Sequence, residues 1–188
     1  MKGRPARLKR AACVLLMLAA ATVVYALAGH VMLGAQAYLF GHPLLIMDIT
    51  RANAALIIGP ENQLRRTRQF PDADFRDVVR PNVATLYTSA FIDMAKGPWV
   101  FEMAANGRRY EVMPFMDAWS NVFAAPGTRT TGTGGGKFLL ADAAWQGRMP
   151  PGLTLLRAPT RIVLLDGSWA CLPLNVSTER PAAARLTI

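Results

Sequence analysis

Side chains able to hold a ligand gather in one loop-rich stretch, Asp117–Gly136. The stretch combines opposite charges, a flat aromatic ring and several amide and hydroxyl groups, which suit a pocket for a polar ligand. The candidate ligand-binding residues, including one tyrosine from an earlier segment, are Tyr87, Asp117, Trp119, Asn121, Arg129 and Thr131. The alternative is loop stabilisation, in which Asp117 pairs with Arg129 and the Asn and Thr side chains bond to nearby backbone.

Gly132–Lys137 invites comparison with the phosphate-binding loop of nucleotide-binding proteins. That loop requires glycine at position 131, Ser or Thr at position 138, and a helix afterwards. This chain has Thr131 and Phe138 there, and a strand pattern follows. We therefore reject a nucleotide-binding loop. Two interpretations remain: a nest of backbone N–H groups that binds an anion, or a tight connection that needs glycine at positive φ.

Histidine and cysteine are too scarce for the common triad and metal chemistries. Both histidines, His30 and His42, precede residue 43, so the remainder of the chain has none for a Ser-His-Asp triad or a multi-histidine metal site. Cys13 and Cys171 are the only cysteines, which excludes a cysteine-based zinc site. The acidic cluster at residues 72–77 lacks the glycine and glutamate of a helix-loop-helix calcium site. We expect no metal and no cofactor.

The formal net charge of +9 does not indicate nucleic-acid binding. Basic residues within the first ten positions contribute five of the nine charges, and the others are scattered. Nucleic-acid binding favours a basic stripe interleaved with aromatic residues, and the sequence shows none. Basic residues ahead of a long apolar run are typical of a membrane-targeting segment instead.

Residues 1–10 form a basic start that should remain in the cytoplasm, and residues 11–31 form an uncharged apolar run. As a helix this run would be about 31 Å long, enough to cross the hydrocarbon core of a bilayer. It is either an uncleaved transmembrane anchor or a signal peptide with its cleavage site at Ala26-Leu27-Ala28. The first interpretation places the body at the cell membrane on the extracytoplasmic side. The second places it in the periplasm.

Hydrophobic periodicity predicts an α+β fold made mainly of antiparallel strands. Residues 35–58 read as a helix that Gly41-His42-Pro43 breaks or kinks, and the apolar period changes to two from residue 85. Asn106-Gly107 predicts a type I′ hairpin between the strands that flank it. We expect a sandwich or partial barrel over residues 85–166. The expected strands are 85–93, 99–103, 109–115, 119–124, 138–141, 153–157 and 160–165.

Four segments carry a resemblance to a known family. They are PNVATLY (81–87), RYEVMPFMDAW (109–119), the loop at 117–136 and RAPTR (157–161). Together they resemble the bacterial domain of unknown function 1254 family, within a family-like domain at residues 35–166. The resemblance implies a first domain that a second conserved domain usually follows, and no established activity. Members commonly carry an acid where this chain has Ala84, so a site that needed this acid would have lost it.

Residues 167–188 lack helix or strand periodicity and do not resemble the family. We predict an irregular tail, and we hypothesise that the reading frame shifted or was truncated near Asp166, so that the usual second domain is missing. Translating the downstream nucleotides in every frame tests this. An edge strand left uncovered by a missing domain would favour aggregation.

The sequence thus predicts an exported or membrane-anchored envelope protein whose β domain binds a small polar ligand or another envelope protein. Residues 11–31 would contact the membrane if they are not cleaved, and no nucleic-acid partner is expected. One alternative is a hydrolase-type enzyme that uses Asp93 or Asp117 with Arg129. Another alternative is a protein that associates structurally with a partner through a sheet edge. The chain could also be a truncated remnant without activity.

Overall fold

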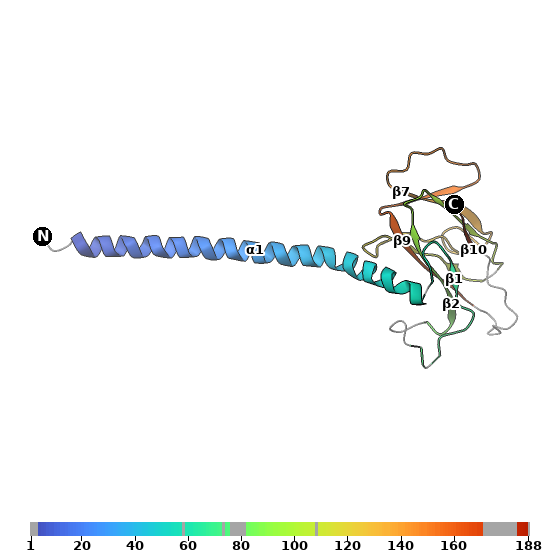
Figure 1. Ribbon diagram of the computed structural model, residues 1–188, viewed down its shortest axis with the longest axis horizontal. Helices are drawn as coiled ribbons and strands as arrows, with labels where there is room; N and C mark the ends of the chain where they lie inside the picture. The colour runs from blue at the N-terminus through green and yellow to red at the C-terminus, as the bar shows by residue number, and fades with distance from the viewer. Residues whose placement is uncertain are drawn as a thin grey trace. The chain divides into compact units, whose positions relative to one another are not determined.

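The computed structural model describes residues 4–57, 59–72, 74–75, 82–107, 109–170 and 184–187. Within them the chain forms one helix, α1 (Arg4–Ile57), followed by strands (Figure 1). The strands are β1 (Arg65–Arg66), β2 (Thr85–Asp93), β3 (Trp99–Met103), β4 (Glu111–Val112), β5 (Phe115–Met116), β6 (Val122–Ala124), β7 (Gly136–Asp142), β8 (Thr154–Ala158), β9 (Ile162–Ala170) and β10 (Ala184–Thr187). The chain divides into two compact units, residues 1–43 and 44–188.

The helix α1 continues from Arg4 to Ile57 with Pro43 inside it, so Gly41-His42-Pro43 does not break the helix. The alternative, a kink at this point, stays a prediction. A proline removes one backbone donor, but the Leu, Ile, Met and Ala residues on either side tolerate or favour a helix. The stretch Ala12–Ala54 is long and apolar enough to cross a membrane, judged by length and composition.

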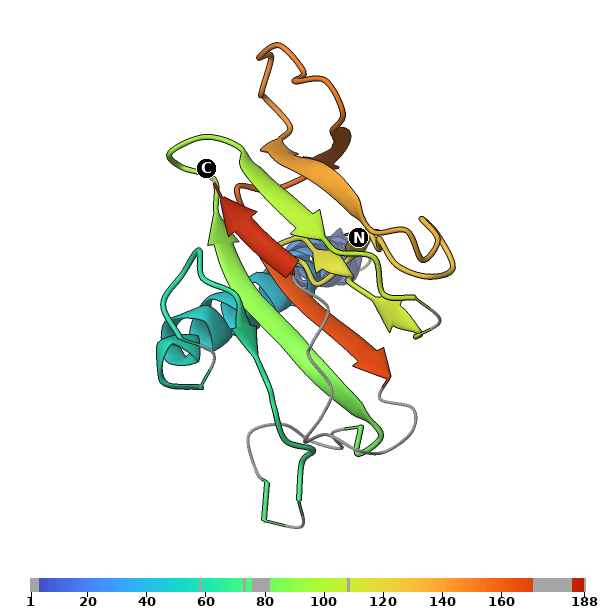
Figure 2. The ribbon, with the colours of Figure 1, turned by 90° about the vertical axis from the view of Figure 1, so that its right-hand side faces the viewer.

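The strands form two sheets. The first has the order β1-β2-β9-β5-β6, with β4 also paired to β9, and the second has the order β10-β3-β7-β8. Figure 2 shows β2 and β9 side by side, and their antiparallel pairing extends over the full length of both strands. The pairs between named strands are antiparallel except β7–β8, which is parallel. This confirms the predicted α+β fold with mainly antiparallel strands.

Apolar side chains from both sheets form a shared core, as in a sandwich. Alternate residues of β2, such as Leu86 and Ile92, are buried together with Phe101 from the second sheet. The rings of Phe101 and Phe115 meet edge to face with their centroids 5.1 Å apart. Because residues alternate between the two faces of a strand, the remaining residues of β2 point to the other face of the first sheet.

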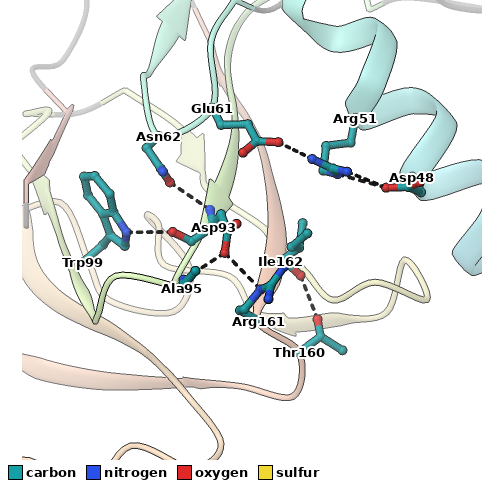
Figure 3. Close-up of polar contacts among 10 residues, drawn as sticks. All are labelled: Asp48, Arg51, Glu61, Asn62, Asp93, Ala95, Trp99, Thr160, Arg161 and Ile162. Atoms are coloured by element: carbon teal, nitrogen blue, oxygen red, sulfur yellow. Dashed lines mark hydrogen bonds and ion pairs between the residues drawn. The ribbon is translucent and has the colours of Figure 1, made fainter.

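The last turns of α1 cover part of that other face. Met47 and Ala54 are buried against Phe91 of β2, and Ile162 and Leu164 of β9 pack beside them. Polar contacts secure the chain that follows the helix (Figure 3). Arg51 binds Asp48 at 2.7 Å and also pairs with Glu61. The Asn62 Oδ1 accepts a hydrogen bond from the backbone N–H of Asp93 at 2.8 Å.

The predicted hairpin at Asn106-Gly107 is wrong. β3 pairs with β7 and β10, whereas β4 pairs with β9, so the chain passes from the second sheet to the first at this turn. Gly107 does adopt a positive φ of 68°, as the Asn-Gly signal indicates. The dipeptide determines the local turn, but the partner of each strand depends on which face of the core it completes.

Part of the predicted irregular tail at residues 167–188 forms strands. β9 continues to Ala170, and β10 pairs with β3 through residues 184–187. Gly167 obscures the alternation in the sequence because it stands at an inward position where a side chain would collide with Met113. Residues 171–183, which include Cys171, lie outside the described residues. The reading-frame hypothesis stays a prediction.

Candidate functional site

The predicted ligand-binding residues lie in three separate places. Asp117, Trp119 and Asn121 belong to one turn between β5 and β6, while Arg129 and Thr131 belong to the threonine-glycine loop (residues 127–135). Tyr87 lies in β2 opposite Ser168, and Met116, the residue before Asp117, lies opposite Leu164. Leu164 and Ser168 are four positions apart along β9, which separates the two rows by about 13 Å. Tyr87 therefore does not join the Asp117 turn.

Asp117 holds the turn that it begins. Its side chain is buried, and its Oδ1 accepts hydrogen bonds from the backbone N–H groups of Trp119 and Asn121, both at 2.9 Å. Its Oδ2 accepts another from the Asn121 side chain at 3.3 Å. Within the described part of the chain, Asp117 and Arg129 form no ion pair. The predicted pairing of these two residues is therefore wrong. The Asp117 carboxylate accepts hydrogen bonds from nearby backbone N–H groups instead.

Asp93 forms its ion pair with Arg161 and not with Arg129. Its Oδ1 lies 3.1 Å from Nε of Arg161 and accepts a hydrogen bond from the backbone N–H of Ala95 at 2.8 Å (Figure 3). The Arg161 side chain is largely exposed, at 62%. The structure thus does not assemble the Asp–Arg129 arrangement that the hydrolase alternative requires.

The threonine-glycine loop is fixed by hydrogen bonds within itself and to neighbouring segments. The Gly127 N–H donates to Thr131 Oγ1 at 3.0 Å, and Thr130 Oγ1 donates to the Ala125 carbonyl at 2.5 Å. Gly135 has a φ of 77°, and a Cβ at this position would lie 2.5 Å from the Met103 carbonyl oxygen. β7 follows directly from Gly136. A strand in place of a helix agrees with the rejection of a nucleotide-binding loop, and the glycines serve a tight connection.

Glu111 is the residue that the sequence interpretation missed. It lies in β4 opposite Trp169, and it is only 1% exposed. A signal was present in the sequence, because Glu111, Met113 and Phe115 alternate with other residues, and the last two belong to the apolar core. A carboxyl group at a core position loses its hydration and needs hydrogen-bond partners to compensate.

Asn106 and Thr128, both partly buried, contact the buried Glu111 and form with it one polar cluster, the Glu111 centre (Asn106, Glu111 and Thr128). The Glu111 N–H donates to Thr128 Oγ1 at 2.9 Å, and the Thr128 N–H donates to the Glu111 carbonyl at 2.9 Å. Asn106 Nδ2 donates to the same Thr128 Oγ1 at 3.4 Å. Gly127 permits this close approach of the loop, because a Cβ there would collide with the Glu111 carbonyl.

Two acceptors of the Glu111 centre lack donors. Glu111 Oε1 and Asn106 Oδ1 are buried and have no hydrogen-bond partner among the described residues. Burial raises the pKa of the Glu111 carboxyl above its ordinary value, and the Asn106 side chain opposes this shift. Buried polar atoms are nearly always satisfied in proteins, so these two acceptors need a proton or a donor group.

A family model described as "Protein of unknown function (DUF1254)" matches residues 61–187, more than half of the chain. The match includes the strand residues after 166 that were expected to differ from the family. It agrees with the resemblance seen in the sequence. A search of curated proteins found no match.

Two solved structures are similar to this chain. One is the crystal structure of the VPA0106 protein from Vibrio parahaemolyticus, with a TM-score of 0.58, 24% identity, and coverage of 72% of this chain and 32% of that one. The other is an uncharacterised protein from Burkholderia cenocepacia, with a TM-score of 0.43, 12% identity, and coverage of 67% and 35%. The chain thus spans about a third of the length of each. The first likeness supports the fold, and the family match shows that the chain belongs to the DUF1254 family, whose function is unknown.

Proposed function

We propose that this protein is a membrane-anchored envelope protein whose β domain, on the extracytoplasmic side, binds a small amine through the Glu111 centre. The single observation that supports the ligand site is the pair of buried acceptors without donors, Glu111 Oε1 and Asn106 Oδ1. A primary ammonium group carries three donors and a positive charge. It would satisfy both oxygens and favour the ionised form of Glu111.

The chemistry of the Glu111 centre disfavours an anionic ligand. Its two free atoms are acceptors, and a phosphate or carboxylate would bring further acceptors beside a carboxyl group. Because Glu111 is almost fully buried, the ligand would reach it only when the threonine-glycine loop moves aside. Gly132 and Gly135 of that loop both have a positive φ, a backbone conformation that glycine adopts without steric cost.

The anchoring part of the proposal rests on α1. Basic residues precede an apolar stretch long enough to span a bilayer, and the positive-inside rule keeps the basic end in the cytoplasm. N-terminal sequencing of the mature protein and protease accessibility in spheroplasts test this part. A mature chain that begins at Gly29 would replace the anchor with a cleaved signal peptide, and a β domain protected from external protease would contradict export.

Ligand binding is tested on the full chain purified in detergent, with butylamine as the probe and butanol as the uncharged control. We expect butylamine to raise the melting temperature in a saturable way that butanol does not reproduce. Glu111→Gln should abolish this shift. Glu102→Gln is the matched control, because Glu102 is a partly exposed carboxylate on β3 paired with Lys137 at 3.2 Å. An equal shift in wild type and Glu111→Gln would show that the amine binds elsewhere, and no shift at all would remove the amine from the proposal.

A further inference from the structure

The end of α1 carries a second apolar face that no described part of its own unit covers. Residues 44–57 belong to the same compact unit as the β domain. Met47 and Ala54 pack on the first sheet, with 7% and 4% exposure. On the opposite side Leu45, Ile49 and Leu56 are 56%, 48% and 88% exposed. A helix that covers a sheet usually presents polar residues to water on its outer face.

Four residues make up this outer apolar stripe (Leu45, Ile49, Ala52 and Leu56). They are spaced by four, three and four residues, which is the spacing of the a and d positions in a coiled coil. At 3.6 residues per turn the stripe lies about 170° around the helix from Met47. The stripe is therefore a continuous line on the face away from the sheet.

The bilayer does not account for this stripe. The apolar stretch Ala12–Ala54 has 43 residues, and a helix needs only about 20 to cross the hydrocarbon core. The stripe lies at the far end of the stretch, in the turns that also carry Asp48 and Arg51. Charged side chains are disfavoured within hydrocarbon, so these turns lie outside it and the stripe needs a cover made of protein.

From this arrangement we infer that the stripe pairs with the same stripe of a second copy of this chain, forming a parallel two-helix dimer. The coiled-coil spacing suits a helical partner, and Ala52 is small enough for a close approach. The membrane segment just upstream, which belongs to the proposed function, would hold two copies parallel and raise their effective concentration. Among the flanking positions 46, 48, 53 and 55 only Asp48 is charged, and Arg51 pairs with it, so like charges do not oppose the dimer.

The pairing is tested by disulfide cross-linking of the full chain in detergent, after Cys13→Ser and Cys171→Ser remove the native thiols. Leu45→Cys, Ile49→Cys and Leu56→Cys should cross-link to dimers under a mild oxidant. Thr50→Cys, at an exposed position of the same turns on another side of the helix, is the control and should cross-link at least several-fold less. Equal cross-linking at all four positions, or none at the stripe, would overturn the inference.

A charge placed on the stripe gives an independent readout. Ile49→Asp should halve the protein mass measured by light scattering in detergent and leave the melting transition of the β domain in place, while Thr50→Asp should keep the dimer mass. A wild-type chain that is monomeric in both detergent and nanodiscs contradicts the dimer. Failure of the anchor would be recognised separately, as a mature chain that begins at Gly29.

Discussion

Asp117 and Glu111 are both buried carboxyl groups on neighbouring segments of the first sheet, yet their surroundings differ. Asp117 accepts hydrogen bonds from two backbone N–H groups and from the Asn121 side chain. Glu111 Oε1 has no such partner among the described residues, and burial raises the pKa of Glu111. A carboxylate whose acceptors are all used holds a turn in place. One that lacks donors can still take up a proton or a ligand.

The largest effect should come from removing the satisfied carboxylate. Asp117→Ala leaves the N–H groups of Trp119 and Asn121 without their acceptor in a partly buried turn. We expect a loss of about 2–4 kcal/mol in the free energy of unfolding, since each buried donor left unpaired costs about 1–3 kcal/mol. Denaturant unfolding followed by tryptophan fluorescence measures this, and Asp117→Asn, which keeps one acceptor, should lose less. Wild-type stability in Asp117→Ala would mean that the turn does not depend on the carboxylate.

Gly127→Ala tests how tightly the threonine-glycine loop is packed on the Glu111 centre. An added Cβ would collide with the Glu111 carbonyl, so the loop or β4 would have to shift, at a cost of about 1–3 kcal/mol. Gly134→Ala is the matched control in the same loop, because a Cβ there meets nothing within 4 Å. Equal melting temperatures for the two variants would contradict the close approach.

The pH dependence of stability in Glu111→Gln tests whether the pKa of Glu111 is raised in the folded protein. Because the pKa of Glu111 is raised in the folded protein above its ordinary value of 4.5, the folded state binds the proton more tightly than the unfolded state. Its stabilising contribution is complete below the ordinary pKa and is lost as the pH rises through the raised pKa. Without ligand, Glu111→Gln should remove this loss, so the variant should gain stability relative to the wild type as the pH rises. Stability curves for the two proteins that stay parallel from pH 4 to pH 8 would disprove the raised pKa.

A third carboxylate, Asp93, should show the smallest effect on stability when its partner is removed. Its ion pair with Arg161 involves a guanidinium that is 62% exposed, and such surface pairs contribute at most about 0.5–1 kcal/mol. Arg161→Ala should therefore lower stability by about 0.5 kcal/mol or less, and salt should reduce the difference further. Unfolding curves at low and high ionic strength measure it. A loss as large as that of Asp117→Ala would show that exposure is a poor guide to the role of these carboxylates.

Local patterns in the sequence were enough to locate several elements. The strands predicted at Thr85–Asp93 and Trp99–Met103 correspond to β2 and β3 over their full lengths. What could not be predicted depends on contacts between distant segments. Asn106-Gly107 shows the turn but not that β3 turns away from β4 to pair with β7. The inward position of Glu111 follows from alternation with Met113, but its missing donors depend on how residues 106 and 128 fold over it.

The pairing of β2 with β9 also has a consequence for how the protein reaches its folded state. Ser89 and Asp166 are hydrogen-bonded although they are 77 positions apart in the sequence, so the central pair of the first sheet closes a long segment of chain. Folds dominated by such distant contacts form slowly. The first sheet cannot assemble until the residues up to 170 have left the ribosome. For a chain that is exported as we propose, this delay favours translocation of the unfolded chain and leaves the β domain to fold on the far side of the membrane.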